Sequence, residues 1–350
     1  MKNLNKKKKA KFFYLQEFLK LLGKKPSKIQ PREAPDFLSQ VMPPPEHLEY
    51  LLRNDSVHGR RTDLNLNNVE VSNEENVENL KWSGIDIVID STPHLTNYKL
   101  LSNHLQNGSE YVVRCSPFKQ ASENMQTIVL GVNGDKLDLD KYKIISMASC
   151  TTNCLAPLVK VVKDYCEKTG NEIIDLDFVT IHAITSDQLT RDSYHKKDLK
   201  RGRDSNNIID SSTGASSQIT LLFPELNGKI FGTAYRVPVA DGSYLELRVE
   251  TRAGIDIKKV NEFFEYAAKS EQFTGILSYE TEPLVSSDCI NDSHTSIYLE
   301  KSAEQINPNK IKICALYDNE FAYSCKIVDL IKEIKYFMEK NNSKKIGGQK

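Results

Sequence analysis

The residues of this chain best suited to chemistry include a cysteine placed where a helix is expected to begin. Cys150 stands in SMASCTTNCLAPL (146–158), after the strand-like run KIISMAS and at the start of an apolar-periodic stretch. A helix N-terminus favours a thiolate through its unpaired N–H groups and its dipole. We therefore predict that Cys150 is a nucleophile, with an inert structural thiol as the alternative. Cys154, one turn further on, is expected to be such a buried thiol.

A reactive thiol needs a base beside it, and the chain has seven histidines from which to supply one. His182 lies in the strand-like run FVTIHAITS (178–186), where it faces the opposite way from Ile181 and Ala183. Spacing alone does not select His182 among the seven. A hydrogen-bonded core histidine is the alternative interpretation of this residue.

A basic N-terminal arm stands out from a composition that is balanced as a whole. The chain has 47 basic and 47 acidic residues, yet residues 1–33 hold eleven Lys and Arg against Glu17 and Glu33. Eleven minus two gives this arm a net charge of +9, so the remainder carries −9. We expect the arm to contact an acidic partner, and a solvated tail is the alternative.

The cysteine content and the apolar runs limit the compartment and the class of protein. Seven cysteines without a C-x-x-C pair favour a reducing compartment and give no metal-site spacing. No apolar run reaches the roughly 18 residues of a membrane span. No small-residue cleavage site follows an apolar core at the N-terminus. We expect a cytoplasmic protein, with a mitochondrial location as the alternative because the N-terminus is basic and rich in Phe and Leu.

The order of apolar runs predicts an α/β chain. An amphipathic helix at 12–22 and a proline-containing linker at 23–45 come first. Short β-rich runs then alternate with helical stretches, which is typical of a parallel sheet. Longer alternating strands follow Cys150 and favour an antiparallel sheet. The expected short strands lie at 84–91, 110–116, 127–132 and 143–149, and the expected long strands at 173–185, 229–239, 243–253 and 310–320.

From this order we predict an incomplete Rossmann-like parallel-sheet domain plus an α+β catalytic domain with a largely antiparallel sheet. The expected parts are a basic extension at 1–45, a degenerate dinucleotide-binding domain at 46–148, a catalytic domain at 149–323, a helix at 324–340 that packs back on the first domain, and a tail at 341–350.

Several motifs together resemble the glyceraldehyde-3-phosphate dehydrogenase family. SMASCTTNCLAPL is followed in the family's order by TIHAITSDQ, SSTGAS, FPELNGKIFGTAYRVPV, PLVSSD and LYDNEFAYS. Upstream, LEYLLRNDSVHGRR, NLKW, VIDST and LGVN extend the match, so that the resemblance covers about residues 45–340. The run SCTTNCLAPL is very specific for this family.

The resemblance implies an NAD-dependent oxidation of a small phosphorylated aldehyde. Cys150 would attack the aldehyde and His182 would act as base; hydride transfer to NAD would then leave a thioester that inorganic phosphate cleaves. The resemblance also assigns roles to further residues. Donors for the attacking phosphate are Ser149, Thr151, Thr213 and Gly214; the substrate's own phosphate would meet Thr185, Arg201 and Arg236; the nicotinamide would lie against Asn319 and Tyr323.

The sequence departs from the family where the adenine half of NAD should bind. It contains no G-x-G-x-x-G, and Gly23 is the only glycine before residue 59. Losing three charge-assisted hydrogen bonds of roughly 1.5–3 kcal/mol each would weaken NAD by at least about three orders of magnitude. Smaller changes are Pro93 in STP, RCSPFK without the usual serine, serine for lysine in SSTGASSQI, and Ala322 for glycine.

Three hypotheses follow. The chain is an active dehydrogenase of this family; or it is a pseudoenzyme recruited through its basic arm as a structural or scaffold subunit of a larger assembly; or it keeps Cys150 and His182 for acyl or thiol chemistry without hydride transfer. The resemblance implies a homo-oligomer, and the altered N-terminus leaves a subunit of a larger complex as the alternative. An N-terminal error in the gene model would also explain the missing glycines.

Overall fold

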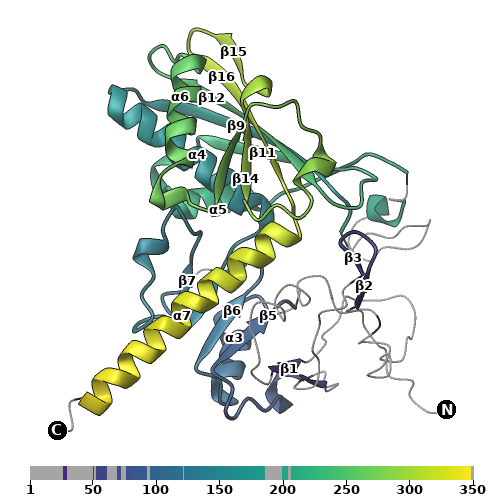
Figure 1. Cartoon of the computed structure of the whole chain (residues 1–350), viewed down its shortest axis with the longest axis vertical. Coiled ribbons are helices and arrows are strands. Elements are labelled where there is room, and N and C mark those ends of the chain that lie inside the picture. The colour runs from purple at the N-terminus through teal and green to yellow at the C-terminus, as the bar shows by residue number, and fades with distance from the viewer. Residues whose placement is uncertain are drawn as a thin grey trace. The chain divides into compact units, whose positions relative to one another are not determined.

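The computed structural model describes residues 27–29, 50, 53–60, 69–71, 76–92, 95–120, 122–185, 199–203 and 206–347 (Figure 1). The helix predicted at 12–22, most of the basic arm, and Pro93 lie outside these residues. Contacts divide the chain into two compact units. The first unit comprises Met1–Ile128, Lys136–Ala148 and Ser324–Lys350, and the second comprises Val129–Asp135 and Ser149–Tyr323.

The first unit contains the predicted parallel sheet. Its strands are β5 (Ile87–Asp90), β6 (Tyr111–Arg114), β7 (Met125–Thr127) and β8 (Ile144–Ser146), in the order β5-β6-β8-β7. All three pairings are parallel. Short runs of apolar residues form these strands because both faces are covered, and Val112, Val113 and Ile144 are fully buried.

Helix α3 (Tyr98–Gln106) packs on β6 and β8. Asn97 caps it by accepting a hydrogen bond from Leu100 N at 3.1 Å. The remaining elements of this unit are short, apart from the C-terminal helix. They are β1 (Ser27–Ile29), β2 (Asn54–Asp55), β3 (Gly59–Arg60), β4 (Val69–Val71), the 3₁₀ helix η1 (Val77–Asn79), and most of α7 (Phe321–Gly347).

The second unit contains one mixed sheet of eight strands. Along the main path the order is β10-β11-β9-β12-β16-β14-β13, with β15 also paired to β16. β9–β11 and β13–β14 are parallel and the other pairings are antiparallel, which confirms the predicted fold class. The strands are β9 (Ile173–His182), β10 (Ile209–Ser211), β11 (Ile230–Arg236), β12 (Ser243–Thr251), β13 (Leu277–Glu280), β14 (Ser296–Leu299), β15 (Glu304–Asn307) and β16 (Lys310–Tyr317).

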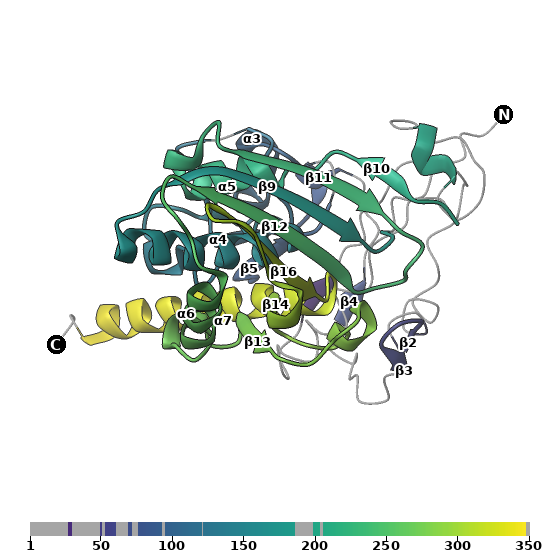
Figure 2. The same cartoon turned by 90° about the horizontal axis from the view of Figure 1, so that it is seen from above.

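Helices α4 (Cys150–Thr169), α5 (Ala215–Leu222) and α6 (Ile257–Ala268) pack on this sheet (Figure 2). Side chains of β12 alternate strictly between buried and partly exposed, as expected where one sheet face is covered and the other is not. On the uncovered side β9 and β11 expose Ile181, Phe231 and Tyr235. Short 3₁₀ helices join the elements: η2 (Gly134–Lys136), η3 (Leu199–Arg203), η4 (Pro224–Leu226), η5 (Glu271–Phe273), η6 (Ser286–Cys289) and η7 (Glu300–Ser302).

Several predicted element bounds differ from the structure, and three of them are described here. The strand expected at 127–132 ends at Thr127, because Asn133 Oδ1 accepts from Val129 N at 2.8 Å and turns the chain. The C-terminal helix begins at Phe321, where Asp318 Oδ1 accepts from Phe321 N at 2.6 Å, and continues to Gly347, beyond the predicted end at 340. The linker predicted at 23–45 contains β1, which pairs in parallel with β4, a partner too distant in sequence for local patterns to reveal.

Candidate active site

Cys150 is the first residue of α4, as the sequence predicts. Ser149 is the N-cap, and its Oγ accepts from Thr152 N at 3.1 Å. Just before it, Ala148 adopts φ 55°, a left-handed conformation unusual for alanine, within a turn where Ala148 N donates to Ser146 Oγ. The turn therefore places a partly buried Cys150 at the positive end of a 20-residue helix.

His182, the last residue of β9, lies beside Cys150. Its Nε2 is 3.4 Å from Cys150 Sγ, a hydrogen-bonding distance for sulfur. His182 is 4% exposed, whereas Ile181 on the opposite face is 41% exposed, so the strand's alternation turns the imidazole inward. The structure brings together the two residues that the sequence placed 32 positions apart.

Three other cysteines of the chain are poorly suited to reaction. Burial raises the pKa of the Cys154 thiol well above its ordinary value, and Cys154 is fully buried. Burial also raises the pKa of Cys166 to about 11 and that of Cys115 to about 12. These thiols stay protonated near neutral pH, which agrees with the prediction that Cys154 is structural.

Arg236 contacts the far side of the histidine ring. The two residues are register partners on the neighbouring strands β9 and β11. Arg236 Nη1 lies 2.7 Å from His182 Nδ1 and 3.1 Å from the Ala183 carbonyl oxygen. That carbonyl oxygen is itself 2.7 Å from Nδ1. The resemblance assigned Arg236 to the substrate phosphate; in this structure its guanidinium contacts the base instead.

Tyr317 lies beneath the pair and joins three elements. Its hydroxyl is 3.0 Å from Thr151 Oγ1 on α4 and 2.8 Å from Thr180 Oγ1 on β9. The Tyr317 and His182 rings meet edge to face, with centroids 6.0 Å apart. Burial holds the pKa of the phenol well above its usual range, so the hydroxyl stays neutral. The sequence reasoning missed this residue, although it stands in the quoted LYDNE motif.

Asn319 is held by a serine that the sequence reasoning also missed. Ser243 Oγ donates to Asn319 Oδ1 at 2.6 Å and accepts from Ala183 N at 3.1 Å. Asn319 and Tyr323 are 2% and 3% exposed. Because Oδ1 faces Ser243, the amide NH₂ of Asn319 faces away from it. Ser243 thus links the end of the histidine strand to the residue expected to hold the nicotinamide.

The residues predicted to bind phosphate differ in what their side chains contact. Ser149 and Thr151 direct their hydroxyls to Thr152 and Tyr317, so their side chains serve the fold here. Gly214 caps α5, and Thr213 Oγ1 accepts from Ala215 N at 3.2 Å. Thr185 is partly buried, three residues beyond β9. Arg201 lies in η3, and its side chain is outside the described part of the chain.

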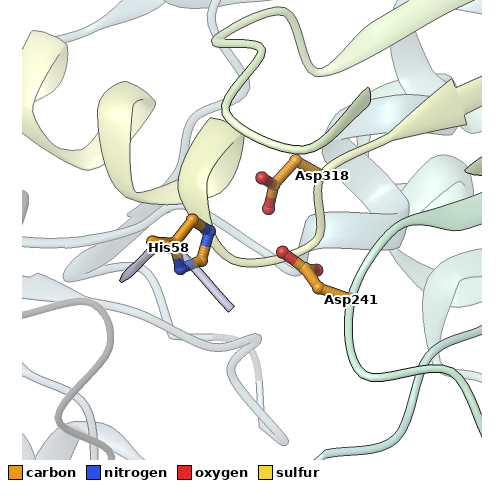
Figure 3. A group of neighbouring side chains, drawn as sticks. All are labelled: His58, Asp241 and Asp318. Atoms are coloured by element: carbon orange, nitrogen blue, oxygen red, sulfur yellow. The ribbon is translucent and has the colours of Figure 1, made fainter. Parts of the chain in front are cut away.

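Two aspartates of the second unit are buried, and one of them, Asp318, stands between Tyr317 and Asn319 in the chain (Figure 3). Asp241 and Asp318 are each 1% exposed and bring carboxylate oxygens within 4.8 Å of each other. Asp318 accepts backbone hydrogen bonds from Glu320, Phe321 and Asn291. Burial and the charges of these aspartates raise the pKa of Cys289 to about 12, so this thiol is also protonated near neutral pH.

The residues present fit one end of NAD. The oriented Asn319 amide suits the carbonyl of a nicotinamide carboxamide, and the buried Tyr323 lies nearby in sequence.

In the described residues of the first unit, no glycine-rich turn opens a helix at the end of a parallel strand, where a pyrophosphate would bind. At the ends of β5 and β6, Asp90 and Arg114 form an ion pair, 2% and 1% exposed, so this guanidinium already has an anionic partner.

Comparison with known proteins identifies the family. The family described as "Glyceraldehyde 3-phosphate dehydrogenase, C-terminal domain" matches residues 149–319. Glyceraldehyde-3-phosphate dehydrogenase 1 of Nostoc sp. is 38% identical over 301 residues, which cover 82% of this chain and 86% of the relative. The chain belongs to the glyceraldehyde-3-phosphate dehydrogenase family. Glyceraldehyde-3-phosphate dehydrogenase 2 of Bacillus subtilis is 37% identical over 302 residues, covering 83% and 86%. Glyceraldehyde-3-phosphate dehydrogenase 1 of Schizosaccharomyces pombe is 37% identical over 299 residues, covering 82% and 86%.

Glyceraldehyde-3-phosphate dehydrogenases are oxidoreductases, and the family normally uses NAD. The resemblance inferred from SCTTNCLAPL is thereby confirmed, and this motif opens the segment that the family match covers. In the described residues of this family member, no helix is long and apolar enough to cross a membrane.

Proposed function

We propose that the chain is a phosphorylating aldehyde dehydrogenase of the glyceraldehyde-3-phosphate type, with Cys150 as nucleophile and His182 as base. The 3.4 Å contact between Cys150 Sγ and His182 Nε2 carries this proposal. A thiol at a helix N-terminus with an imidazole in hydrogen-bonding reach is the arrangement that makes a thiolate. Family membership selects the reaction from the several that such a pair could support.

The first step adds Cys150 to the aldehyde. The thiol proton passes to His182 Nε2 as the sulfur forms a bond to the carbonyl carbon, and the new hydroxyl oxygen receives a proton from the same nitrogen. Asn319 and Tyr323 would hold the nicotinamide end of NAD, which would supply the acceptor for the hydride of that carbon. His182 takes the hydroxyl proton at this stage. A phosphate oxygen then attacks the thioester carbon, and Cys150 leaves as thiolate.

Anion-binding groups around the pair support a phosphorylated substrate. Arg236, the last residue of β11, contacts the base, and Thr185 follows the end of β9 by three residues. We assign both, with Arg201, to the substrate's phosphate. Arginine suits this task because its planar fork binds two phosphate oxygens. We assign the attacking phosphate to Ser149, Thr151, Thr213 and Gly214, of which Gly214 offers the N-terminus of an eight-residue helix.

An activity assay tests this proposal. The purified chain is mixed with glyceraldehyde 3-phosphate, NAD and inorganic phosphate, and NADH absorbance is followed. We expect NADH to form with wild type, and Cys150→Ser to abolish it. Cys166→Ser is a matched control, since this thiol lies near the C-terminal end of the helix that Cys150 begins and should leave the rate nearly unchanged. Absence of NADH formation by a folded chain at millimolar NAD would refute the proposal.

A second candidate function rests on the sequence of the N-terminus. Residues 1–58 hold one glycine, Gly23, and no G-x-G-x-x-G, while eleven Lys and Arg fall within residues 1–33. This observation favours a family-derived subunit, not cycling NAD, that joins a larger assembly through its basic arm. Calorimetric titration with NAD separates the two functions: micromolar affinity would support the dehydrogenase, and no heat at millimolar NAD would support the subunit.

We also propose that the protein is a cytoplasmic homo-oligomer. The uncovered face of the eight-stranded sheet exposes Ile181, Phe231 and Tyr235, which are the kinds of residue found in the cores of interfaces. Native mass spectrometry of the full chain and of a variant lacking residues 1–33 tests both the oligomer and the arm. If this face forms the interface, the deletion leaves the copy number unchanged. If the arm forms it, the deletion gives monomers.

A further inference from the structure

Three asparagines of this chain are followed directly by glycine. The pairs are Asn107-Gly108, Asn133-Gly134 and Asn227-Gly228. In such a pair the main-chain nitrogen of glycine can attack the side-chain amide carbon of asparagine, because glycine has no Cβ to hinder the approach. A cyclic imide forms and ammonia leaves. The asparagine side chain and the glycine N–H must both be available, so the surrounding structure decides which pair reacts.

The Asn107 pair is held on both sides of the reacting bond. Asn107 is the C-cap of α3, and its Nδ2 donates to the Val77 carbonyl oxygen at 2.7 Å. Gly108 N donates to the Leu105 carbonyl oxygen at 3.1 Å. A Cβ on Gly108 would lie 3.1 Å from Ser83 N, so the turn is also crowded. The amide and the attacking nitrogen of this pair are therefore both engaged.

The Asn133 pair is held through a single neighbour. Asn133 Oδ1 accepts from Val129 N at 2.8 Å, and Asn133 N donates to the Val129 carbonyl oxygen at 3.1 Å. Asn133 and Gly134 are both partly buried, and Gly134 is the first residue of η2. The side-chain amide of this pair must therefore leave a hydrogen bond before it can react.

The Asn227 pair lies in an exposed turn that joins η4 to β11. Asn227 has φ −61° and ψ 126°, and Gly228 has φ 76°, which are the angles of a type II turn. Lys229 N closes the turn by donating to the Leu226 carbonyl oxygen at 2.9 Å. Among the described residues, none forms a hydrogen bond with the Asn227 side chain or with Gly228 N. Apart from chain neighbours, no described atom lies within 4 Å of a Cβ built on Gly228.

We propose that Asn227 is a site of spontaneous deamidation and isoaspartate formation, with water as the co-reactant. Rotation about the Cα–C bond of Asn227 breaks the one hydrogen bond that closes the turn and brings Gly228 N to Cγ. A bond forms between these two atoms, and Nδ2 leaves as ammonia after the Gly228 N–H proton reaches it through water. Water then opens the imide at either carbonyl carbon, which gives aspartate or isoaspartate. The reaction is independent of the proposed dehydrogenase chemistry.

Isoaspartate at position 227 would alter the entry into β11, because it adds a carbon atom to the main chain. The Lys229 carbonyl oxygen accepts from Leu176 N at 2.7 Å, and Ile230 is the register partner of Leu176 on β9. A longer main chain cannot keep both this hydrogen bond and the one that closes the turn. We therefore expect the isoaspartyl chain to be less stable than Asn227→Asp, which adds the same charge without the extra atom.

Peptide mass spectrometry of the aged chain tests the proposal. The full chain is kept near neutral pH for several weeks, once in buffer and once in concentrated urea, and the converted fraction of each Asn-Gly pair is followed. In buffer we expect Asn227 to convert at least about tenfold faster than Asn107 and Asn133, a factor that corresponds to about 1.4 kcal/mol of hydrogen bonding. In urea the three rates should become similar. An isoaspartyl-specific methyltransferase should label the peptide of Asn227 in the chain aged in buffer.

Two variants sharpen this test. Asn227→Gln should abolish the fast conversion, because glutamine would have to close a larger ring, and Asn133→Gln is the matched control that should leave it unchanged. Circular dichroism confirms that both variants are folded. Comparable rates at the three pairs in the folded chain would overturn the proposal, as would an Asn227 amide that survives in buffer while it converts in urea.

Urea denaturation tests the expected effect on β11. The isoaspartyl chain, separated by chromatography, should unfold at a lower urea concentration than Asn227→Asp. Equal midpoints would refute the effect on the strand and leave the modification site to be judged by its rate alone.

Discussion

Ser243 orients Asn319: its hydroxyl donates to Asn319 Oδ1 at 2.6 Å while accepting from Ala183 N at 3.1 Å. All three polar groups are buried, so each hydrogen bond determines which way the next group faces. This relay begins at Ala183, directly after the strand that carries His182. It fixes the orientation of the amide of Asn319, the residue that we assign to the nicotinamide.

Ser243→Ala tests the relay. Without the hydroxyl, the Asn319 amide loses the partner of Oδ1 and can turn over. One neutral hydrogen bond of about 1 kcal/mol corresponds to roughly a fivefold weaker affinity. We expect the KM for NAD, or its Kd by calorimetry, to rise about fivefold while kcat changes less. Ser217→Ala, in an exposed position on α5, is the control. An unchanged affinity would mean that Ser243 does not position Asn319.

His182→Ala tests the base by its effect on the thiol. With inorganic phosphate present, we expect iodoacetamide to label Cys150 far faster than Cys154, whose pKa is raised by burial. Removing the imidazole should slow the labelling of Cys150 at least about tenfold, since a hydrogen bond within an ion pair is worth about 1.5 kcal/mol or more. His294→Ala, which removes a histidine paired with Asp292, should leave the rate unchanged. Equal labelling of Cys150 and Cys154 would contradict the account.

Asp90→Asn tests the buried ion pair at the end of the parallel sheet. The substitution leaves Arg114 buried without its counter-charge, which costs about 3–5 kcal/mol. Urea denaturation should show a correspondingly lower free energy of unfolding, and Asp90→Asn combined with Arg114→Met should recover much of it. Glu172→Gln, at an exposed pair with Arg252, should shift the midpoint far less. A loss no larger than that of the control would show that the pair does not stabilise the unit.

Cys289 should make stability fall at alkaline pH. Burial and neighbouring carboxylates raise its pKa from 9.0 to about 12 in the folded state. Between these values the unfolded chain releases the thiol proton while the folded chain keeps it, so stability drops by about 1.4 kcal/mol per pH unit. Below pH 9 the thiol is protonated in both states and has no effect. The free energy of unfolding of Cys289→Ala should fall less steeply than that of wild type between pH 9 and 11. If urea denaturation gives wild type and variant the same slope of unfolding free energy against pH, this assignment is refuted.

The sequence predicted those parts of the site that depend on local pattern. An apolar-periodic run directly after Cys150 indicated that a helix begins there, and strand alternation indicated that His182 faces away from Ile181. The short parallel strands and the long antiparallel ones also followed from period and length. What local pattern could not show was which strands become neighbours, and hence that Arg236 would stand beside His182.

The residues missed share one property, which is that their roles depend on partners distant in sequence. Ser243 lies 60 residues from Ala183 and 76 from Asn319, and Tyr317 lies 166 residues from Thr151. The pairing of β1 with β4 is of the same kind. Tyr317 and Asn319 do stand two apart in LYDNE, so a closer examination of that motif could have singled out the tyrosine.

Cys150 is expected to carry the acyl group of the oxidised aldehyde, and intact-protein mass spectrometry tests this directly. The chain is mixed with glyceraldehyde 3-phosphate and NAD without inorganic phosphate, then quenched in acid and weighed. We predict one acyl group per chain, mapped to the peptide of Cys150, removed by added phosphate and absent from Cys150→Ser. A folded chain that remains unmodified at millimolar NAD, or that carries the group on another residue, would contradict the claim.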